Sequence, residues 1–406
     1  MTGKSILVLS TVPDERLEMV LKECRTLGYR SIYCGEPHPD AASQADVCYN
    51  ADWDDLSELK DIALKENIDG AVGLCDKAMV PISRLTEELS LPGNNPESIE
   101  RILSKNGFRQ LQEEAGVFCP GHVLAGTAEE ACAKGGSLRF PVIVKPLLCS
   151  SSFGMTVLKE KSGLAEAFTK ASSYSRNGRV CIEEYYENPS LKIVEIDLFV
   201  LGEDILWDGI RYCYRTERAP LRPVYDVYPV DLTAEQTEVI KTSVEAVLRA
   251  AGVSIGEYNV EGFFTEDGHF FTVEINPRQA GHYNPQDIEL YSGVDLTKLL
   301  ITTACGDHSY YNELKTFERT HNNVLSYSIF SYEEGILESI HIDESLMPKL
   351  HEHRYLHGQK PGDHIKDIWH AARPVSKAVF VFDAKEELEA ARVRIEDLVY
   401  PVLKKD

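Results

Sequence analysis

Apolar and polar positions follow two different periods at the beginning of the chain. Short apolar runs at 4–10, 30–35 and 69–75 are typical of strands, and amphipathic stretches at 14–27 and 54–67 are typical of helices. Strands that alternate with helices predict a parallel α/β sheet. The first strand is not followed by a G-x-G-x-x-G pattern, so we do not expect this unit to bind a dinucleotide.

A break rich in Pro, Gly and Asn at 91–96 ends this first unit. The predicted elements after the break are helices at 98–103 and 105–114, strands at 140–146 and 179–186, a helix at 233–250, strands at 324–330 and 377–382, and a charged helix at 386–399. A chain of this length with both kinds of pattern predicts an α/β or α+β protein of two or three domains.

The stretch 258–281 carries the clearest local prediction. Apolar-rich runs at 259–265 and 269–276 flank Glu266-Asp267-Gly268, and Asp-Gly between such runs is a strong hairpin signal. A two-residue turn at Asp-Gly places Glu266 opposite His269, Phe264 opposite Phe271 and Val260 opposite Ile275. One face of the hairpin then carries the core residues Val260, Phe264, Phe271, Val273 and Ile275.

The other face of the same hairpin carries Glu261, Glu274 and Asn276. In the predicted register Glu261 lies directly opposite Glu274, and like charges across a ladder are destabilising. The pair therefore indicates a bound cation, and three oxygen ligands suit magnesium better than zinc. The alternative is a half-solvated hairpin whose outer face is acidic. Pro277 ends the ladder, and the guanidinium of Arg278 suits phosphate or carboxylate, so the whole group suits a metal-bound polyphosphate.

Composition narrows the classes of function. The 406 residues are 43% hydrophobic and 26% charged, which is ordinary for a soluble globular protein. The net charge of −23 argues against nucleic acid or an anionic membrane as the main partner. We expect no signal peptide and no transmembrane segment. The ten cysteines are scattered without a C-x-x-C pair, so we expect reduced thiols and a cytoplasmic protein.

Two further segments offer cations for an anionic ligand. Lys145 is the only charge in the apolar run before a loop that contains Ser151, Ser152 and Gly154. An ammonium group and a loop of hydroxyls and backbone N–H groups suit phosphates, although Ser/Gly turns are also common without a ligand. The arginine-rich segment 211–222, which we expect to be a loop, is the best candidate for binding an anionic substrate group. Solvated loop arginines are the alternative.

The hairpin and the tail from Glu274 to Arg278 resemble the metal-binding end of the ATP-grasp superfamily, whose enzymes mostly join a carboxylate to an amine at the expense of ATP. The resemblance implies an ATP-grasp fold with an N-terminal Rossmann-like α/β domain and a small C-terminal β-rich domain. The implied boundaries are 1–95 for the N-terminal domain, 96–310 for the ATP-grasp domain, with a small lobe at about 120–185 and a large lobe at about 186–310, and 311–406 for the C-terminal domain.

The resemblance also implies roles for single residues. The implied nucleotide-binding residues are Lys105, Lys145, Ser151, Ser152 and Gly154 on the phosphates, Glu183, Glu184 and Tyr186 on the adenine side, and Glu195 on the ribose. The implied metal ligands are Glu261, Glu274 and Asn276, and the implied catalytic residues are Lys145 and Arg278. The substrate candidates are Arg211, Arg215 and His282.

The function that this resemblance implies is ATP-dependent ligation of a carboxylate to an amine, with an amino acid substrate. The reaction would pass through an acylphosphate, release ADP and phosphate, and need ATP with Mg²⁺ or Mn²⁺. The alternatives are an enzyme like biotin carboxylase, a ligase of the purine-synthesis type, and a non-catalytic nucleotide-binding regulator. We expect small-molecule substrates and no nucleic acid or membrane partner; the oligomeric state is left open, a homodimer being one option.

Overall fold

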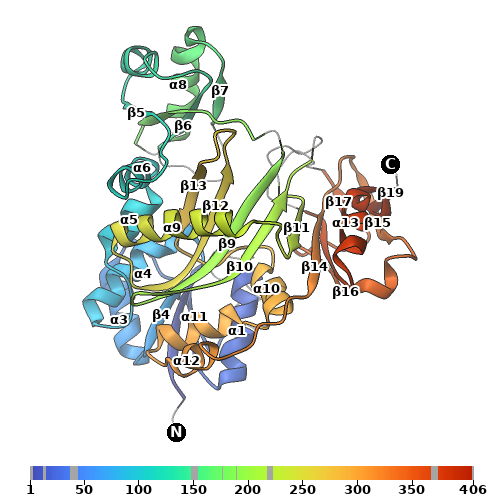
Figure 1. Ribbon diagram of the computed structural model, residues 1–406. Helices are drawn as coiled ribbons and strands as arrows, with labels where there is room; N and C mark the ends of the chain where they lie inside the picture. Colours follow the sequence, from blue (N-terminus) through green and yellow to red (C-terminus); the bar gives the residue numbers. More distant parts are fainter. Residues whose placement is uncertain are drawn as a thin grey trace.

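The computed structural model describes residues 3–11, 15–36, 44–147, 154–175, 177–188, 190–216, 223–366 and 374–404. Figure 1 shows a large central sheet, with a smaller sheet above it, the N-terminal unit below it and the C-terminal elements at one side. Strands and helices both contribute throughout, which confirms the mixed α/β class predicted from the sequence.

The N-terminal unit is built on a parallel sheet in the order β3-β2-β1-β4. Its strands are β1 (Ser5–Leu9), β2 (Arg30–Cys34), β3 (Val47–Tyr49) and β4 (Gly70–Gly73), and its helices are α1 (Glu15–Leu27), α3 (Leu56–Glu66) and α4 (Asp76–Leu89). Apolar side chains fill both faces of the sheet, as expected when helices cover it. The parallel α/β sheet predicted from the alternating periods is confirmed.

Two short helices lead from this unit toward the smaller sheet. They are α5 (Pro96–Leu103) and α6 (Lys105–Glu114). The side chain of Asn95 caps α5, whose first residue is Pro96, and the Ser104 hydroxyl caps α6 by accepting from the N–H of Gly107. These local signals fix where both helices begin, close to the bounds predicted from the sequence.

The smaller sheet is antiparallel, in the order β5-β8-β6-β7. Its elements are β5 (His122–Ala125), α7 (Ala128–Glu130), the π-helical turn η1 (Ala131–Gly135), β6 (Val142–Pro146), β7 (Thr156–Leu158), the 3₁₀ turn η2 (Lys161–Gly163), α8 (Leu164–Tyr174) and β8 (Val180–Glu184). The helix α8 packs its apolar side on the sheet to form a core of its own. The helix α8 therefore covers only one face of the smaller sheet.

The large sheet has the order β13-β12-β9-β10-β11-β14-β18-β16. Its strands are β9 (Lys192–Leu201), β10 (Asp204–Tyr214), β11 (Tyr225–Tyr228), β12 (Ile255–Phe264), β13 (Phe270–Asn276), β14 (Asn323–Ile329), β16 (Leu350–Tyr355) and β18 (Ser376–Phe382). The helix α9 (Ala234–Ala251) packs with α5 and α6 against one face, where the main apolar core lies. On the other face α10 (Asn284–Ser292), α11 (Leu296–Ala304) and α12 (Ser309–Leu314) cover part of the sheet.

The C-terminal segment contributes three strands to the large sheet, so the boundary predicted at residue 310 separates segments that share one sheet. Its remaining elements are β15 (Gly335–Ile342), the 3₁₀ turn η3 (Met347–Lys349), β17 (His364–Ile365), α13 (Lys385–Val393), α14 (Ile395–Leu398) and β19 (Val399–Lys404). The single helix predicted at 386–399 is wrong in its second half, because the first helix ends before Arg394 and a four-residue helix follows.

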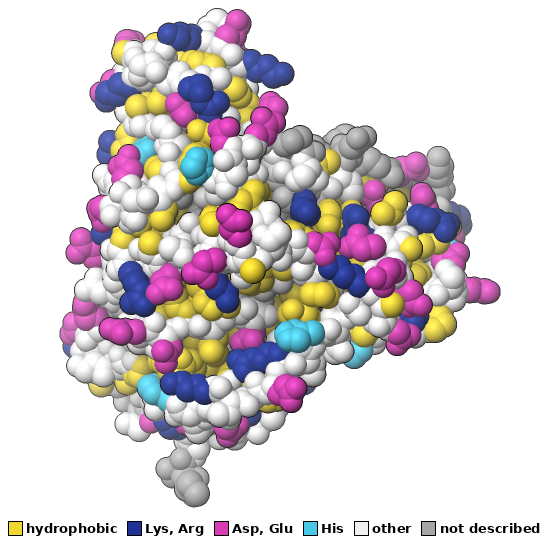
Figure 2. Space-filling view, viewed as in Figure 1, with side chains coloured by type: hydrophobic (Ala, Val, Ile, Leu, Met, Phe, Trp, Pro, Cys, Tyr) yellow, Lys and Arg dark blue, Asp and Glu magenta, His cyan; other side chains and the backbone are white. Residues whose placement is uncertain are grey.

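The surface is mixed in charge. On the face drawn in Figure 2, acidic and basic side chains are interspersed. The cysteines that the structure describes are all free. In the described part of the chain, none of the helices has the length and apolarity that a membrane span requires.

Candidate active site

The β12–β13 hairpin places two glutamates opposite each other, as predicted. Glu261 pairs with Glu274 and Val260 with Ile275. The turn, however, is longer than predicted: the N–H of Thr265 donates to the carbonyl of His269 at 2.9 Å, which leaves a loop of three residues at 266–268.

A β-bulge restores the predicted register at the glutamates. Near the turn Phe264 pairs with Phe270, one residue away from the predicted partner, and the register then shifts by one between Glu261 and Gly262. The extra residue in the turn and the extra residue in the bulge cancel, so the Glu261–Glu274 pair keeps its place. The predicted pairs nearer the turn are wrong for this reason.

The bulge also changes which aromatic side chains face the core. Val260, Phe264 and Ile275 lie with the core under α9, as predicted. Phe271 and Val273 instead lie with Phe263 on the opposite face, so their predicted place in the core is wrong. Side chains change face across a bulge because an unpaired residue breaks the period of two.

Four charged side chains form a row across neighbouring strands, which we call the carboxylate row. In register, Glu274 of β13 pairs with Glu261 of β12, Glu261 pairs with Glu195 of β9, and Glu195 pairs with Arg211 of β10. Paired residues in a ladder point to the same face. Asn276 lies on this face as well, because its amide donates to Glu274 Oε1 at 3.1 Å.

The electrostatics of the row favour a bound cation. Burial, and then the neighbouring charges of Glu274 and Glu195, raise the pKa of Glu261 to about 8. A buried carboxylate whose pKa is raised by neighbouring carboxylates belongs to a donor set that a hard divalent cation fits, because its charge replaces the proton and its preferred ligands are oxygens. The residues present therefore fit Mg²⁺ or Mn²⁺ at the exposed end of the row.

Arg211 closes the other end of the row. It lies in β10 and is fully buried, so the expectation that it belongs to a loop is wrong; the strand extends to Tyr214. Its guanidinium is ion-paired with Glu195 and Asp197, and its Nε lies 3.4 Å from Asp226 Oδ1. These acceptors occupy Arg211, which explains why an arginine is tolerated inside a sheet.

Arg215, immediately after β10, takes a different position. One of its guanidinium nitrogens lies 3.9 Å from Glu261 Oε2, and its side chain is half-buried. The guanidinium of Arg215 therefore lies beside the carboxylate row, within reach of a ligand that binds there. Of the two arginines predicted as substrate candidates, Arg211 is part of the row and Arg215 lies next to it.

Glu183 and Lys145 form an ion pair beneath the smaller sheet. Lys145 Nζ lies 2.6 Å from Glu183 Oε2, and Arg109 of α6 donates to both oxygens of Glu183 at 3.3 and 3.1 Å. Burial alone would raise the pKa of Glu183, but the two cations lower it well below its usual range. Glu183 is thus a permanent anion between two cations.

Arg109 was not singled out in the sequence, although it connects both sheets. It also donates to the carbonyls of Thr272 and Val273, at 3.3 and 3.1 Å, in the bulged part of β13. Gln112, on the same helix, donates to the Thr272 carbonyl at 3.0 Å. The available signal was a charged residue on the buried side of α6, between Phe108 and Leu111.

The other predicted nucleotide residues are distributed around this pair. Glu184 Oε1 accepts from the N–H of Arg139 at 3.0 Å. The ring of Tyr186 packs edge-on against Phe118, with ring centroids 5.1 Å apart. Lys105 begins α6, and Gly154 adopts a positive φ of 71° just before β7. Ser151 and Ser152 lie outside the described residues.

Arg278 and His282 lie where the N-terminal unit meets the large sheet. Arg278 Nε donates to Asp76 Oδ1, the first residue of α4, at 2.8 Å. The backbone N–H of His282 donates to Glu15 Oε1 at 2.6 Å. Burial lowers the pKa of His282 to about 4. Lys377 of β18, also not singled out, donates to the His282 carbonyl and to Asp287.

This chain is similar in sequence to several known proteins. A family model described as D-ala D-ala ligase C-terminus matches residues 122–280. The y4rH protein of Sinorhizobium fredii is 28% identical over 298 residues, which are 70% of this chain and 58% of that protein, so the match spans less than two thirds of that relative. The formate-dependent phosphoribosylglycinamide formyltransferase of Bacillus subtilis is 27% identical over 283 residues, covering 68% of this chain and 71% of that enzyme.

The solved structures extend the likeness over the whole chain. The L-amino acid ligase of Bacillus licheniformis superposes with a TM-score of 0.83 at 17% identity and covers 100% of both chains. Other solved structures with this fold were determined with ADP bound. The family model over residues 122–280 and the shared fold make this chain similar to ATP-grasp ligases.

Proposed function

We propose that the chain is an ATP-dependent ligase that joins a small carboxylate, with an amino acid as one substrate, to an amine. The observation that carries this proposal is the carboxylate row, in which Glu274, Glu261 and Glu195 share one face of the sheet and the pKa of Glu261 is raised to about 8. Such a row is costly unless a cation offsets its negative charge. In the proposed reaction the phosphates of ATP would bind the other side of that cation.

The nucleotide would lie between the two sheets. Lys145 and Lys105 are its proposed phosphate contacts, and Lys145 can keep Glu183 as a partner while it binds phosphate, because an ammonium group has three donors. Glu184 and Tyr186 are proposed on the adenine side, and Glu195 on the ribose. The aromatic group around Tyr186 and Phe271 supports an apolar place for the base.

Glu261, Glu274 and Asn276 are the proposed ligands of Mg²⁺ or Mn²⁺, and the bound cation would neutralise charge on the β- and γ-phosphates. Asn276 supports this set by its hydrogen bond to Glu274, which orients the carboxylate. Arg215, 3.9 Å from Glu261, would balance the remaining negative charge.

The reaction then needs positioning more than covalent chemistry from the protein. A carboxylate oxygen of the acid attacks the γ-phosphorus, the bond from that phosphorus to the bridging oxygen breaks, and an acylphosphate and ADP form. The amine nitrogen attacks the acyl carbon, phosphate leaves with the carbon–oxygen electron pair, and the nitrogen gives its proton to solvent. Arg278 stabilises the transferred group and the oxyanion. His282, half-buried and uncharged, would contact the acid without adding charge.

The test is ADP release with Mg-ATP, measured across pools of amino acids and small carboxylates, with mass spectrometry of any product. We expect ADP release only when an acid and an amine are both present. The mass of the product should equal the mass of the acid plus the mass of the amine minus the mass of one water. Release that requires bicarbonate in place of an amine would indicate a carboxylase. No release with any pair contradicts the proposal.

A matched pair of variants makes the test specific. Lys145→Ala should abolish ADP release, because it removes a phosphate contact beside the buried Glu183. Lys170→Ala, an exposed lysine of α8 in the same lobe, should leave release unchanged. Equal activity of the two variants would remove Lys145 from the mechanism.

A further inference from the structure

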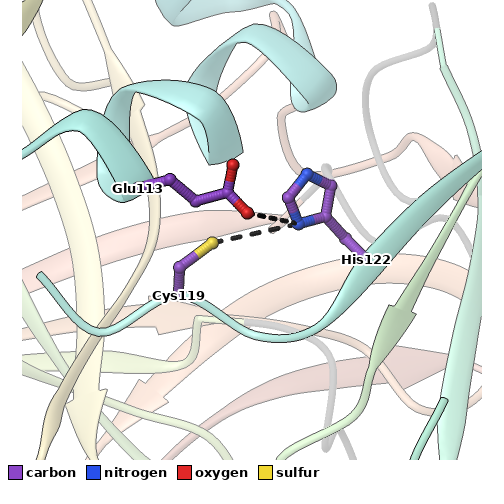
Figure 3. Close-up of side chains that lie close together, drawn as sticks. All are labelled: Glu113, Cys119 and His122. Carbon is purple, nitrogen blue, oxygen red and sulfur yellow. Dashed lines mark hydrogen bonds and ion pairs between the residues drawn. The ribbon is translucent and has the colours of Figure 1, made fainter. Parts of the chain in front are cut away.

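A second group of metal-binding side chains lies outside the carboxylate row, where α6 leads into β5. Glu113 is near the end of α6, Cys119 is in the connection and His122 is the first residue of β5. One ligand atom from each lies within 4.8 Å of the other two. Figure 3 shows the carboxylate and the thiol converging on the same nitrogen of the imidazole ring.

The distances in this group are close to those of a zinc site. Cys119 Sγ lies 3.9 Å from His122 Nδ1, and the same nitrogen lies 4.0 Å from Glu113 Oε1. Zinc binds sulfur at about 2.3 Å and imidazole nitrogen at about 2.0–2.1 Å, which in a tetrahedral site separates the two ligand atoms by roughly 3.5 Å. A movement of about half an ångström would therefore bring the sulfur and the nitrogen to that separation, and the exposed Glu113 side chain would move closer to complete the set.

The chemistry of the donors selects the metal. Thiolate sulfur and imidazole nitrogen are ligands that zinc prefers, whereas magnesium takes oxygen ligands. We propose that Glu113, Cys119 and His122 bind one zinc ion, at a site separate from the carboxylate row. Zinc displaces the proton of the Cys119 thiol, and that proton leaves to solvent. His122 binds the ion through Nδ1 and carries its ring proton on Nε2. Glu113 is largely exposed, so the fourth position is open to water.

The contacts that zinc would replace are weak. Cys119 Sγ lies 3.5 Å from the Arg109 carbonyl and 3.6 Å from the Pro120 carbonyl, and His122 Nδ1 lies 3.3 Å from the Pro120 carbonyl. A thiol is a poor hydrogen-bond donor, so little is lost when these contacts give way to metal bonds. The sequence Cys-Pro-Gly-His keeps the two ligands three residues apart on one short loop.

The position of the site predicts what the ion would do. Glu113 lies one turn beyond Arg109 on α6, and His122 is the ladder partner of Glu183 in β5–β8. A bound ion would therefore join the end of α6 to the first strand of the smaller sheet, beside the Arg109–Glu183 ion pair. We expect zinc to stabilise this junction, because the folded arrangement adds Glu113 to the two ligands and binds the ion more tightly than the unfolded chain does.

The experiment is a titration of the full-length, chelator-treated protein with zinc alone, followed by calorimetry. We expect one equivalent to bind and the melting temperature to rise. Cobalt in place of zinc should give a charge-transfer absorption in the near ultraviolet, which reports a thiolate ligand. Cys119→Ser should abolish that absorption, and His122→Gln should weaken zinc binding by more than about 10-fold, since even changes outside the ligand shell cost that much.

Two further variants keep the test decisive. Glu113→Gln changes an exposed side chain, so it should fold normally and still weaken binding. Cys48→Ser alters an exposed cysteine in β3 of the N-terminal unit and should leave binding unchanged. The proposal is overturned if the wild-type chain binds no zinc, or if the bound equivalent is unaffected by all three ligand substitutions. Neither result bears on ligase activity, which is measured with magnesium.

Discussion

Arg109 and Glu183 form a bidentate ion pair in which both side chains are only 2% exposed. The pair joins α6 to β8, and Arg109 extends the connection to the bulge of β13 through the carbonyls of Thr272 and Val273. Glu274, the proposed metal ligand, follows that bulge directly. One guanidinium thus holds the smaller sheet, with Lys145, at a set distance from the carboxylate row.

The first prediction concerns stability at this junction. Arg109→Leu should lower the free energy of unfolding by roughly 3–5 kcal/mol, because it leaves Glu183 charged and buried with Lys145 as its remaining partner. Urea denaturation followed by circular dichroism measures the change. Arg84→Leu removes an exposed arginine paired with Glu100 and should cost less than about 1 kcal/mol. A similar small loss in both variants would contradict the buried-pair argument.

The second prediction concerns the cation. Glu274→Ala should abolish ATP turnover and leave the fold intact, because the Glu274 side chain is exposed. The variant should also lose the rise in melting temperature that Mg-ATP gives the wild-type chain. Glu266→Ala, in the exposed loop of the same hairpin, is the matched control and should keep both properties. Turnover near the wild-type level in well-folded Glu274→Ala would remove the hairpin as the metal site.

The N-terminal unit and the hairpin could be predicted from the sequence because both depend on local period and turn chemistry. The alternating pattern at 4–75 was sufficient for the parallel sheet. The Glu261–Glu274 pair was predicted correctly although the turn was not: a loop of three residues and a bulge offset each other. A bulge depends on what packs against the strand, here Arg109 binding to its carbonyls, and no local pattern contains that.

Arg211 shows the opposite case. An arginine-rich, tyrosine-containing segment is typical of an exposed loop, yet Arg211 lies in the middle of the large sheet. Its partners Glu195 and Asp197 come from β9, and their alternation in an otherwise apolar run was the signal that something charged must face them. Only the register between β9 and β10 identifies which residue that is. The predicted nucleotide and metal roles stay predictions until the variants are assayed.

The third prediction is a dependence of stability on pH that comes from His282. Burial holds its pKa at about 4, against 6.5 for the free group, with Glu15, Lys377, His357 and Arg16 as the charged neighbours. Between these values the unfolded chain binds the proton more readily, so stability falls as the pH falls from 6.5 toward 4. The loss from this group is at most about 3 kcal/mol. The denaturation midpoint should fall less steeply with falling pH in His282→Gln than in the wild-type chain. An unchanged dependence of the midpoint on pH would assign the effect to other groups.

The fourth prediction separates positioning from stability. Asp76 accepts from Arg278 Nε at 2.8 Å and is the first residue of α4, so it holds the guanidinium from the N-terminal unit. Asp76→Asn keeps an acceptor oxygen but removes the charge, which should lower kcat by about 10- to 100-fold while KM for ATP changes little, since the proposed contact of Arg278 is to the transferring group. The melting temperature should change little, because the pair is partly exposed. Asp54→Asn, an exposed residue of the same unit, should leave kcat unchanged. If Asp76→Asn raises KM at constant kcat, Arg278 acts in ground-state binding and its proposed role in stabilising the transferred group and the oxyanion must be given up.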